Sequence, residues 1–92
     1  MQTKIIKADG TEQEVLPKDG KYFSLEEMQE IVGGFIEMIS CNDQNFLCVL
    51  NEEGKINELP INEKATKLVD KIISPDDYLV GDVLITESKY VQ

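Results

Sequence analysis

Two cysteines and no histidine set the limits of side-chain chemistry in this chain. Six residues separate Cys41 from Cys48, which is not the Cys-x-x-Cys spacing of a redox pair or a zinc site. Both lie in apolar, strand-like runs, and a thiol nucleophile would lack the histidine base that usually activates it. We therefore expect two buried, reduced thiols without a catalytic role, as in a cytoplasmic protein.

Carboxylates are numerous, but their spacing is typical of neither a metal site nor an acid–base pair. Asp76, Asp77 and Asp82 lie in or near expected turns, as does the pair Glu52-Glu53. None of them follows the alternate-position spacing of a calcium loop. A chain of 92 residues also leaves little material for the walls of a substrate cleft. We expect a protein that is not an enzyme, with no catalytic residue, metal ion or cofactor.

Glu37 is a charged residue inside an apolar strand-like run. Burying an unpaired carboxylate is costly, so this side chain must be paired, hydrogen-bonded, protonated or exposed. Three interpretations stay open: a strand edge reaching solvent or a pair with Lys4, a polar group sharing a cavity or interface with Asn51 or Asn62, and a catalytic acid. We take Glu37, Asn51 and Asn62 as candidate binding residues.

The charge balance points away from nucleic acids. Nine lysines, no arginine and 18 acidic residues give a formal net charge of −9. Arginine is the side chain best suited to bidentate recognition of phosphate and guanine, and an acidic surface repels a polyanion. We expect no direct binding to nucleic acid. The same charge speeds encounters with basic partners.

A capping box predicts the first helix. Ser24 is followed three residues later by Glu27, and the apolar residues of 25–32 recur at helical spacing. Gly33 stands where a left-handed C-terminal cap belongs, and Gly34 gives a tight entry into the next strand. Because these glycines follow a helix instead of leading into one, they do not form a phosphate cradle.

A hairpin follows this helix. Residues 35–41 and 46–50 are apolar runs that flank a polar loop of four residues, with Cys41 expected to face Phe46. In that register apolar residues point to both faces of the strand pair. We expect a helix to cover one face, and strands or a partner subunit to cover the other.

Three more strands are predicted, two before the first helix and one directly after this hairpin. Residues 3–8 and 11–16 flank Asp9-Gly10, a dipeptide typical of a tight β-turn. Gly54 suits a left-handed turn position before a strand over residues 55–59.

The C-terminal third predicts a helix and a last strand. Asn62 is a good N-cap for a helix over residues 63–72. Residues 78–85 form the last strand, in which Gly81 marks a bulge or a close backbone approach. The order β-β-α-β-β-β-α-β predicts one α+β domain over residues 1–92, built on a mostly antiparallel sheet with two helices. No segment is long and apolar enough to span a membrane.

Three segments resemble a known family. They are Leu25-Glu26-Glu27-Met28-Gln29-Glu30-Ile31-Val32-Gly33-Gly34-Phe35-Ile36-Glu37, the group Asn51-Glu52-Glu53-Gly54-Lys55, Leu59-Pro60-Ile61-Asn62 and Ala65-Thr66, and Leu79-Val80-Gly81-Asp82-Val83-Leu84-Ile85. Their order and spacing are similar to those of small uncharacterised proteins from phages, plasmids and other mobile elements, catalogued as a domain of unknown function. The resemblance implies a mobile-element setting but no activity, catalytic residue or ligand.

Two classes of function follow. The first is a non-enzymatic protein-interaction module that binds a host protein, and modulates a host system, through an acidic or strand-edge surface; association as a homodimer belongs to this class. The second is a binder of a small polar or nucleotide-like ligand at a subunit interface. A concave pocket gathering two or more lysines would favour the second class.

Overall fold

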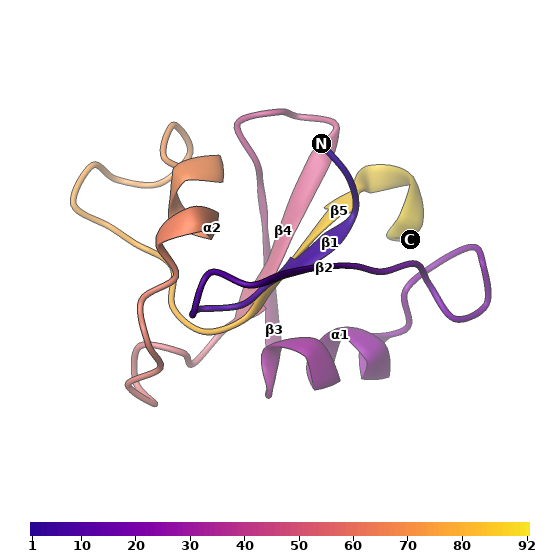
Figure 1. The fold of residues 1–92 in the computed structure, drawn as a ribbon, viewed down its shortest axis with the longest axis horizontal. Coiled ribbons are helices and arrows are strands. Elements are labelled where there is room, and N and C mark those ends of the chain that lie inside the picture. Colours follow the sequence, from indigo (N-terminus) through magenta and orange to yellow (C-terminus); the bar gives the residue numbers. More distant parts are fainter.

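A five-stranded antiparallel sheet forms the centre of the computed structural model, which describes residues 1–92. The strands are β1 (Lys4–Ile6), β2 (Glu12–Glu14), β3 (Ile36–Ser40), β4 (Phe46–Asn51) and β5 (Val83–Glu87), and the helices are α1 (Leu25–Val32), α2 (Glu63–Leu68) and the short 3-10 helix η1 (Ser88–Tyr90). Across the sheet the order is β2-β1-β5-β4-β3, so β2 and β3 are its edges (Figure 1). The predicted α+β fold with two α-helices is confirmed.

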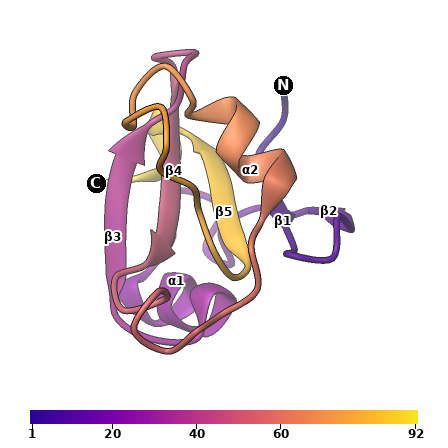
Figure 2. The ribbon, with the colours of Figure 1, turned by 90° about the vertical axis from the view of Figure 1, so that its left-hand side faces the viewer.

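One helix packs on each face of the sheet, as the two views of Figures 1 and 2 show. On one face, residues of α1 bury Val49 and Leu84. On the other, α2 and the segment before β5 cover Cys48 and Ile85. The predicted covering of one face by a helix is confirmed. The second face, for which strands or a partner subunit were expected, is covered by a helix and loops of the same chain.

The second hairpin has the predicted register. In the β3–β4 pair Ile39 lies opposite Cys48, and the Cys41 amide donates to the Phe46 carbonyl oxygen at 3.0 Å. Both thiols are free and buried. Burial raises the pKa of Cys41 to about 11, and burial also raises the pKa of Cys48. The two thiols therefore stay protonated at neutral pH and pack as small apolar groups.

Helix α1 begins and ends at the predicted residues. The Ser24 hydroxyl accepts from the Glu27 amide at 3.0 Å, and the Glu27 carboxylate accepts from the Ser24 amide at 3.0 Å. Gly33 ends the helix with φ of +80°, the left-handed conformation that favours glycine. An added Cβ on Gly34 would lie 3.0 Å from Asn51 Nδ2, so this glycine permits the close approach of β3 to the end of β4.

Helix α2 is shorter than predicted because the loop of the β3–β4 hairpin ends it. Its N-cap is Asn62, as expected, and it stops at Leu68 instead of continuing to Ile72. The Asn42 amide donates to the Leu68 carbonyl oxygen at 2.8 Å, and the Asn42 side chain accepts from the Lys71 amide at 2.9 Å. A tertiary contact from the hairpin loop thus replaces the last helical turn.

The strand predicted over Lys55–Leu59 is wrong, because turns satisfy this backbone locally. The Leu59 amide donates to the Gly54 carbonyl oxygen at 3.0 Å, and Glu58 adopts a positive φ of 56°. Gly54 is not left-handed as expected; an added Cβ there would lie 2.7 Å from Val80 Cγ2. The extended element between β4 and α2 is reduced to the isolated bridge between Ile61 and Val80.

The other strands are displaced or shortened at their ends. β5 begins at Val83 instead of residue 78 and runs on to Glu87. Gly81 interrupts the extended chain with φ of +76°, and its carbonyl oxygen accepts from Asn62 Nδ2 at 2.9 Å, so it marks the predicted close approach just before the strand. β1 and β2 each keep only three residues of the predicted runs. Neither α-helix has the length and apolar character needed to cross a membrane.

Candidate functional site

The outer side of β3 is an open sheet edge. Hydrogen bonds join Cys41 to Phe46 and Phe35 to Glu52, so odd-numbered residues of β3 point their backbone groups at β4. Because these directions alternate along an antiparallel strand, the even-numbered residues point theirs away from the sheet. The outward-facing residues are Ile36, Met38 and Ser40. In Figure 2 β3 is the left margin of the sheet, and no strand pairs with its outer side.

The composition of β3 does little to block another strand. Natural edge strands are usually short, charged, bulged or interrupted by proline. β3 has five residues, with Glu37 as its one charge. The opposite edge, β2, has three residues, and two of them are the glutamates Glu12 and Glu14. β3 therefore offers a template for pairing that β2 does not.

Exposed apolar side chains lie beside this open edge. Phe35, directly before β3, is 64 % exposed, and Met38 within the strand is 38 % exposed. Ile56, in the turns after β4, is 79 % exposed and shares a cavity with residues of β3. Apolar groups gathered next to unpaired backbone donors and acceptors are typical of an interaction surface.

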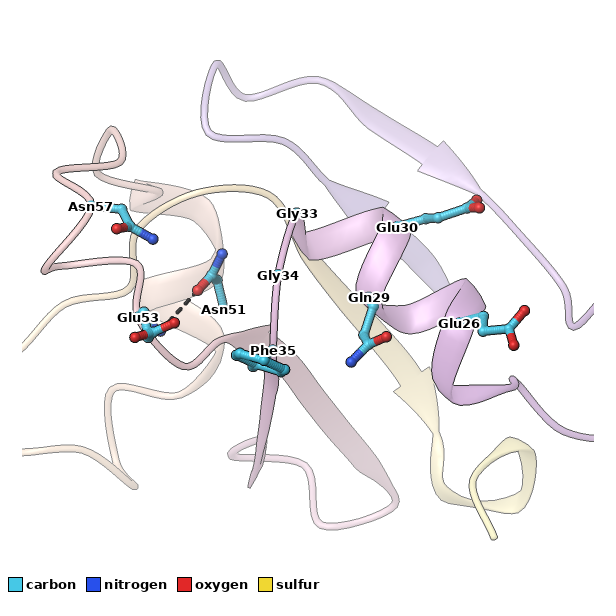
Figure 3. Close-up of a pocket in the computed structure, with 9 residues that line it drawn as sticks. All are labelled: Glu26, Gln29, Glu30, Gly33, Gly34, Phe35, Asn51, Glu53 and Asn57. Carbon is cyan, nitrogen blue, oxygen red and sulfur yellow. Dashed lines mark hydrogen bonds between the residues drawn. The ribbon is translucent and has the colours of Figure 1, made fainter.

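An acidic cavity of about 560 Å³ opens where α1 passes into β3 (Figure 3). The turn after β4 contributes Glu53; α1 contributes Glu26 and Glu30, whose carboxylates point away from Phe35 in Figure 3. Phe35, the one hydrophobic residue of the lining, lies between the two sides. No lysine lines the cavity, and the last turn of α1, whose end carries partial negative charge, has no basic residue. The start of β3 therefore favours cationic groups.

A second cavity, of about 180 Å³, lies beside β3 on the face covered by α2. Its lining is mostly apolar and includes Ile39 and Leu50 from the two strands. Lys55, also in the lining, pairs with Asp77 and lies 4.7 Å from the centre of the Tyr78 ring. The hydrogen bond from Lys55 holds the pKa of Asp77 below its usual value.

Glu37 lies at the open edge, which agrees with the first of its three interpretations. Its side chain is exposed, and it forms no ion pair in the structure. The pair with Lys4 does not form, because Lys4 binds Glu12 at 2.7 Å. Glu37 also lines the 180 Å³ cavity together with Asn51. The structure thus brings two of the three candidate binding residues to one place.

The side chains of both candidate asparagines are used within the fold. Asn62 is 0 % exposed; its Nδ2 donates to the carbonyl oxygens of Ile6 and Gly81, each at 2.9 Å, and its Oδ1 accepts from the Ala65 amide. Asn51 is 5 % exposed and donates to the Val32 carbonyl oxygen at 3.1 Å. Asn62 therefore lies outside the candidate surface. Asn51 is buried next to this surface and lines both cavities.

The turn carboxylates considered as metal ligands are spread over the molecule. Asp82 accepts from the Ala8 amide at 3.0 Å, and Asp77 pairs with Lys55. The structure gathers no group of three or more cysteine, aspartate and glutamate side chains that could hold a metal ion.

Sequence reasoning did not select Phe35, Met38 or Ile56. The signal available for Phe35 and Met38 is a strand run with a single charge and neither lysine nor proline. No such signal exists for Ile56, because its place beside β3 depends on the turns that replace the predicted strand.

Comparison with known proteins gives one match. The sequence model of a family described as a domain of unknown function (DUF3846) matches residues 3–90. No curated protein and no solved structure matches the chain. The resemblance to a family of unknown function is confirmed at that level, and the match spans the whole sheet and both α-helices.

Proposed function

We propose that this chain, which belongs to the DUF3846 family, is a non-enzymatic interaction module that binds an extended segment of another protein along β3. In this mode the partner adds a strand to the sheet, and main-chain hydrogen bonds supply much of the affinity. The observation that carries the proposal is the open edge of β3, with outward-facing backbone at Ile36, Met38 and Ser40.

The setting of the partner follows from the resemblance to proteins of phages and plasmids. In such a setting the partner is a host protein, and the module modulates a host system by occupying one of its extended segments. The proposal places the chain in the cytoplasm and includes no nucleic acid or membrane among its partners.

The small-ligand alternative receives less support from the cavities. A nucleotide-like ligand would need several cations around its phosphates, because the chain has no arginine. The 560 Å³ cavity has no lysine, and in the 180 Å³ cavity Lys55 is already paired with Asp77. Calorimetric screening against nucleotides and divalent cations tests this alternative directly.

The experiment is affinity capture from a lysate of the host cell with a matched pair of proline variants. Met38→Pro removes an outward-facing amide of β3 and leaves the ladder to β4 intact. Glu14→Pro is the control, because the bonds of Lys7 to Thr11 and of Val15 to Thr3 leave the Glu14 amide facing outward from β2. Ser40→Pro is a second β3 variant, in case Met38→Pro lowers the stability of the fold.

We expect both β3 variants to lower the affinity for the captured protein by about tenfold or more, which equals ~1.4 kcal/mol. Glu14→Pro should stay within about twofold of the wild type, because the β2 edge takes no part. Equal binding by all folded variants would contradict the proposal. Tight binding of a nucleotide or cation with no protein captured would replace it by the ligand-binding alternative.

A further inference from the structure

The 180 Å³ cavity lies within reach of a strand added to β3. Glu37 and Ile39 line this cavity and point to the face covered by α2. A residue paired with either of them would project its side chain to the same face, because cross-strand neighbours share a side of the sheet. The cavity is therefore positioned to accept one side chain of the added segment.

The size and lining of this cavity select an apolar side chain. A dry apolar cavity of about 150 Å³ in another protein holds one benzene molecule, so about 180 Å³ is enough for one aromatic or branched aliphatic side chain. The walls include Ile39, Leu50, Ile73 and Leu79. Ile56, 79 % exposed, adds apolar surface that the incoming side chain would bury.

The charges around β3 determine which residues can flank this apolar anchor, the side chain that enters the cavity. Glu37 is exposed and unpaired on the strand, and the cavity at the start of β3 adds Glu53, beside Phe35, and has no lysine in its lining. A second copy of the chain would bring another net charge of −9 and another Glu37 to the same edge, and like charges across paired strands are destabilising. A basic segment complements this edge.

We infer, building on the proposed function, that the segment added to β3 belongs to another protein and carries one aromatic or branched apolar residue between basic residues. The apolar side chain fills the 180 Å³ cavity beside Glu37 and Ile39, and the basic side chains lie over the carboxylates along the edge. The backbone gives affinity without sequence preference, and the anchor and the charges give the preference.

Four synthetic nine-residue peptides test this inference. Their shared pattern is Thr-Val-Lys-Val-Phe-Val-Lys-Val-Thr, in which the two Lys and the Phe share one face of a strand. The other three replace Phe by Ser, both Lys by Glu, or all three together. Binding is measured by calorimetry at low salt and at about 0.5 M salt, where exposed charges are screened.

We expect the Lys–Phe peptide to bind most tightly. Replacing Phe by Ser should weaken binding about tenfold at both salt concentrations, and replacing Lys by Glu should do so only at low salt. Ile39→Trp, which fills the cavity, should abolish the difference between Phe and Ser. Glu37→Lys should favour the Glu peptides, whereas Glu14→Lys on the β2 edge should leave the preference for Lys unchanged.

The outcomes separate this inference from the proposed function. If the four peptides bind equally and Met38→Pro weakens all of them, the inferred chemistry of the partner is wrong and the β3 edge stands. If Phe and Ser peptides bind equally, the cavity does not receive the anchor, which also contradicts the inference. If no peptide binds in a way that Met38→Pro weakens, both the inference and the proposed function fail.

Discussion

The two edges of the sheet differ in length, charge and surroundings. β2 ends the sheet with three residues, and Glu12 within it is held by Lys4 at 2.7 Å and by Lys64 at 3.2 Å. β3 ends it with five residues and one unpaired carboxylate, Glu37, flanked by the exposed Phe35. A sheet with one protected and one unprotected edge has a single direction in which it can grow.

The two edges differ in whether their carboxylates are paired with lysines. On the β2 side Lys4 and Lys64 both pair with Glu12, and their hydrogen bonds hold the pKa of Glu12 below its usual value. On the β3 side Glu37 and Glu53 form no ion pair. One buried asparagine supports each half of the molecule: Asn62 ties β1 to α2, and Asn51 ties α1 to β4.

The largest expected loss of stability follows from replacing Asn62, which joins β1 to α2. Asn62→Ala removes the N-cap of α2 and the bonds to the carbonyl oxygens of Ile6 and Gly81. We expect the free energy of unfolding to fall by about 3 kcal/mol, because a lost cap and unsatisfied buried carbonyls add up. Denaturant titration measures this loss. Partner affinity of the folded fraction should not change; a change would place Asn62 in the binding surface after all.

A smaller loss of stability is expected from replacing Asn51, which joins α1 to β4. Asn51→Ala removes the bond to the Val32 carbonyl oxygen and the one from the Glu53 amide, at 3.1 and 2.8 Å. We expect unfolding to become easier by about 2 kcal/mol. Because Asn51 lies beneath both cavities, this variant should also weaken partner binding. An unchanged affinity would show that the surface does not depend on this support.

The junction of α1 and β3 tolerates a side chain at a moderate cost. Gly33→Ala places a Cβ on a residue with φ of +80°, where no neighbouring atom lies within 4 Å. Backbone strain alone should therefore lower the free energy of unfolding by about 1 kcal/mol. Thermal unfolding measures the effect, and an unchanged melting temperature would contradict it. Gly20→Ala, also at positive φ with open space around it, is a matched control for the size of this strain.

The smallest effect concerns the capping box at the start of α1. Hydrogen bonds from the amides of Ser24 and Lys18 hold the pKa of Glu27 below the ordinary value of 4.5. The ionised carboxylate thus stabilises the fold above about pH 4.5, and this contribution disappears as the pH falls through the lowered pKa. Glu27→Gln keeps the capping geometry, and water screens the charge of this exposed carboxylate. The substitution should therefore lower the free energy of unfolding by only about 0.3 kcal/mol at pH 7, and should not change it near pH 2.

Local signals in the sequence were sufficient for the parts of the fold that depend on near neighbours. The capping box of Ser24 and Glu27, the left-handed Gly33 and the pairing of Cys41 with Phe46 each involve residues a few positions apart. The N-cap Asn62 was also predicted from residues close to it in the sequence. Such contacts form in the same way whatever the rest of the chain does.

Long-range contacts decided the parts that sequence reasoning missed. Asn42 ends α2 from 26 positions away, and Val80 packs against Gly54 across the segment that was expected to be a strand. The edge position of β3 depends on β5 pairing between β1 and β4, which brings the last strand into the middle of the sheet. Glu37 was recognised as unusual, but its open surroundings and the neighbouring Ile56 become visible only in three dimensions.

Residue-resolved amide hydrogen exchange by NMR tests the role of the β3 edge most directly. In the free protein the amides of Met38 and Ser40 should exchange fast, and those of Glu37 and Ile39, which face β4, should exchange slowly. Saturation with the Lys–Phe peptide should slow exchange at Met38 and Ser40 by about tenfold or more and leave Glu14 on β2 unchanged. Protection that appears elsewhere, with Met38 and Ser40 still exchanging fast, would contradict the account.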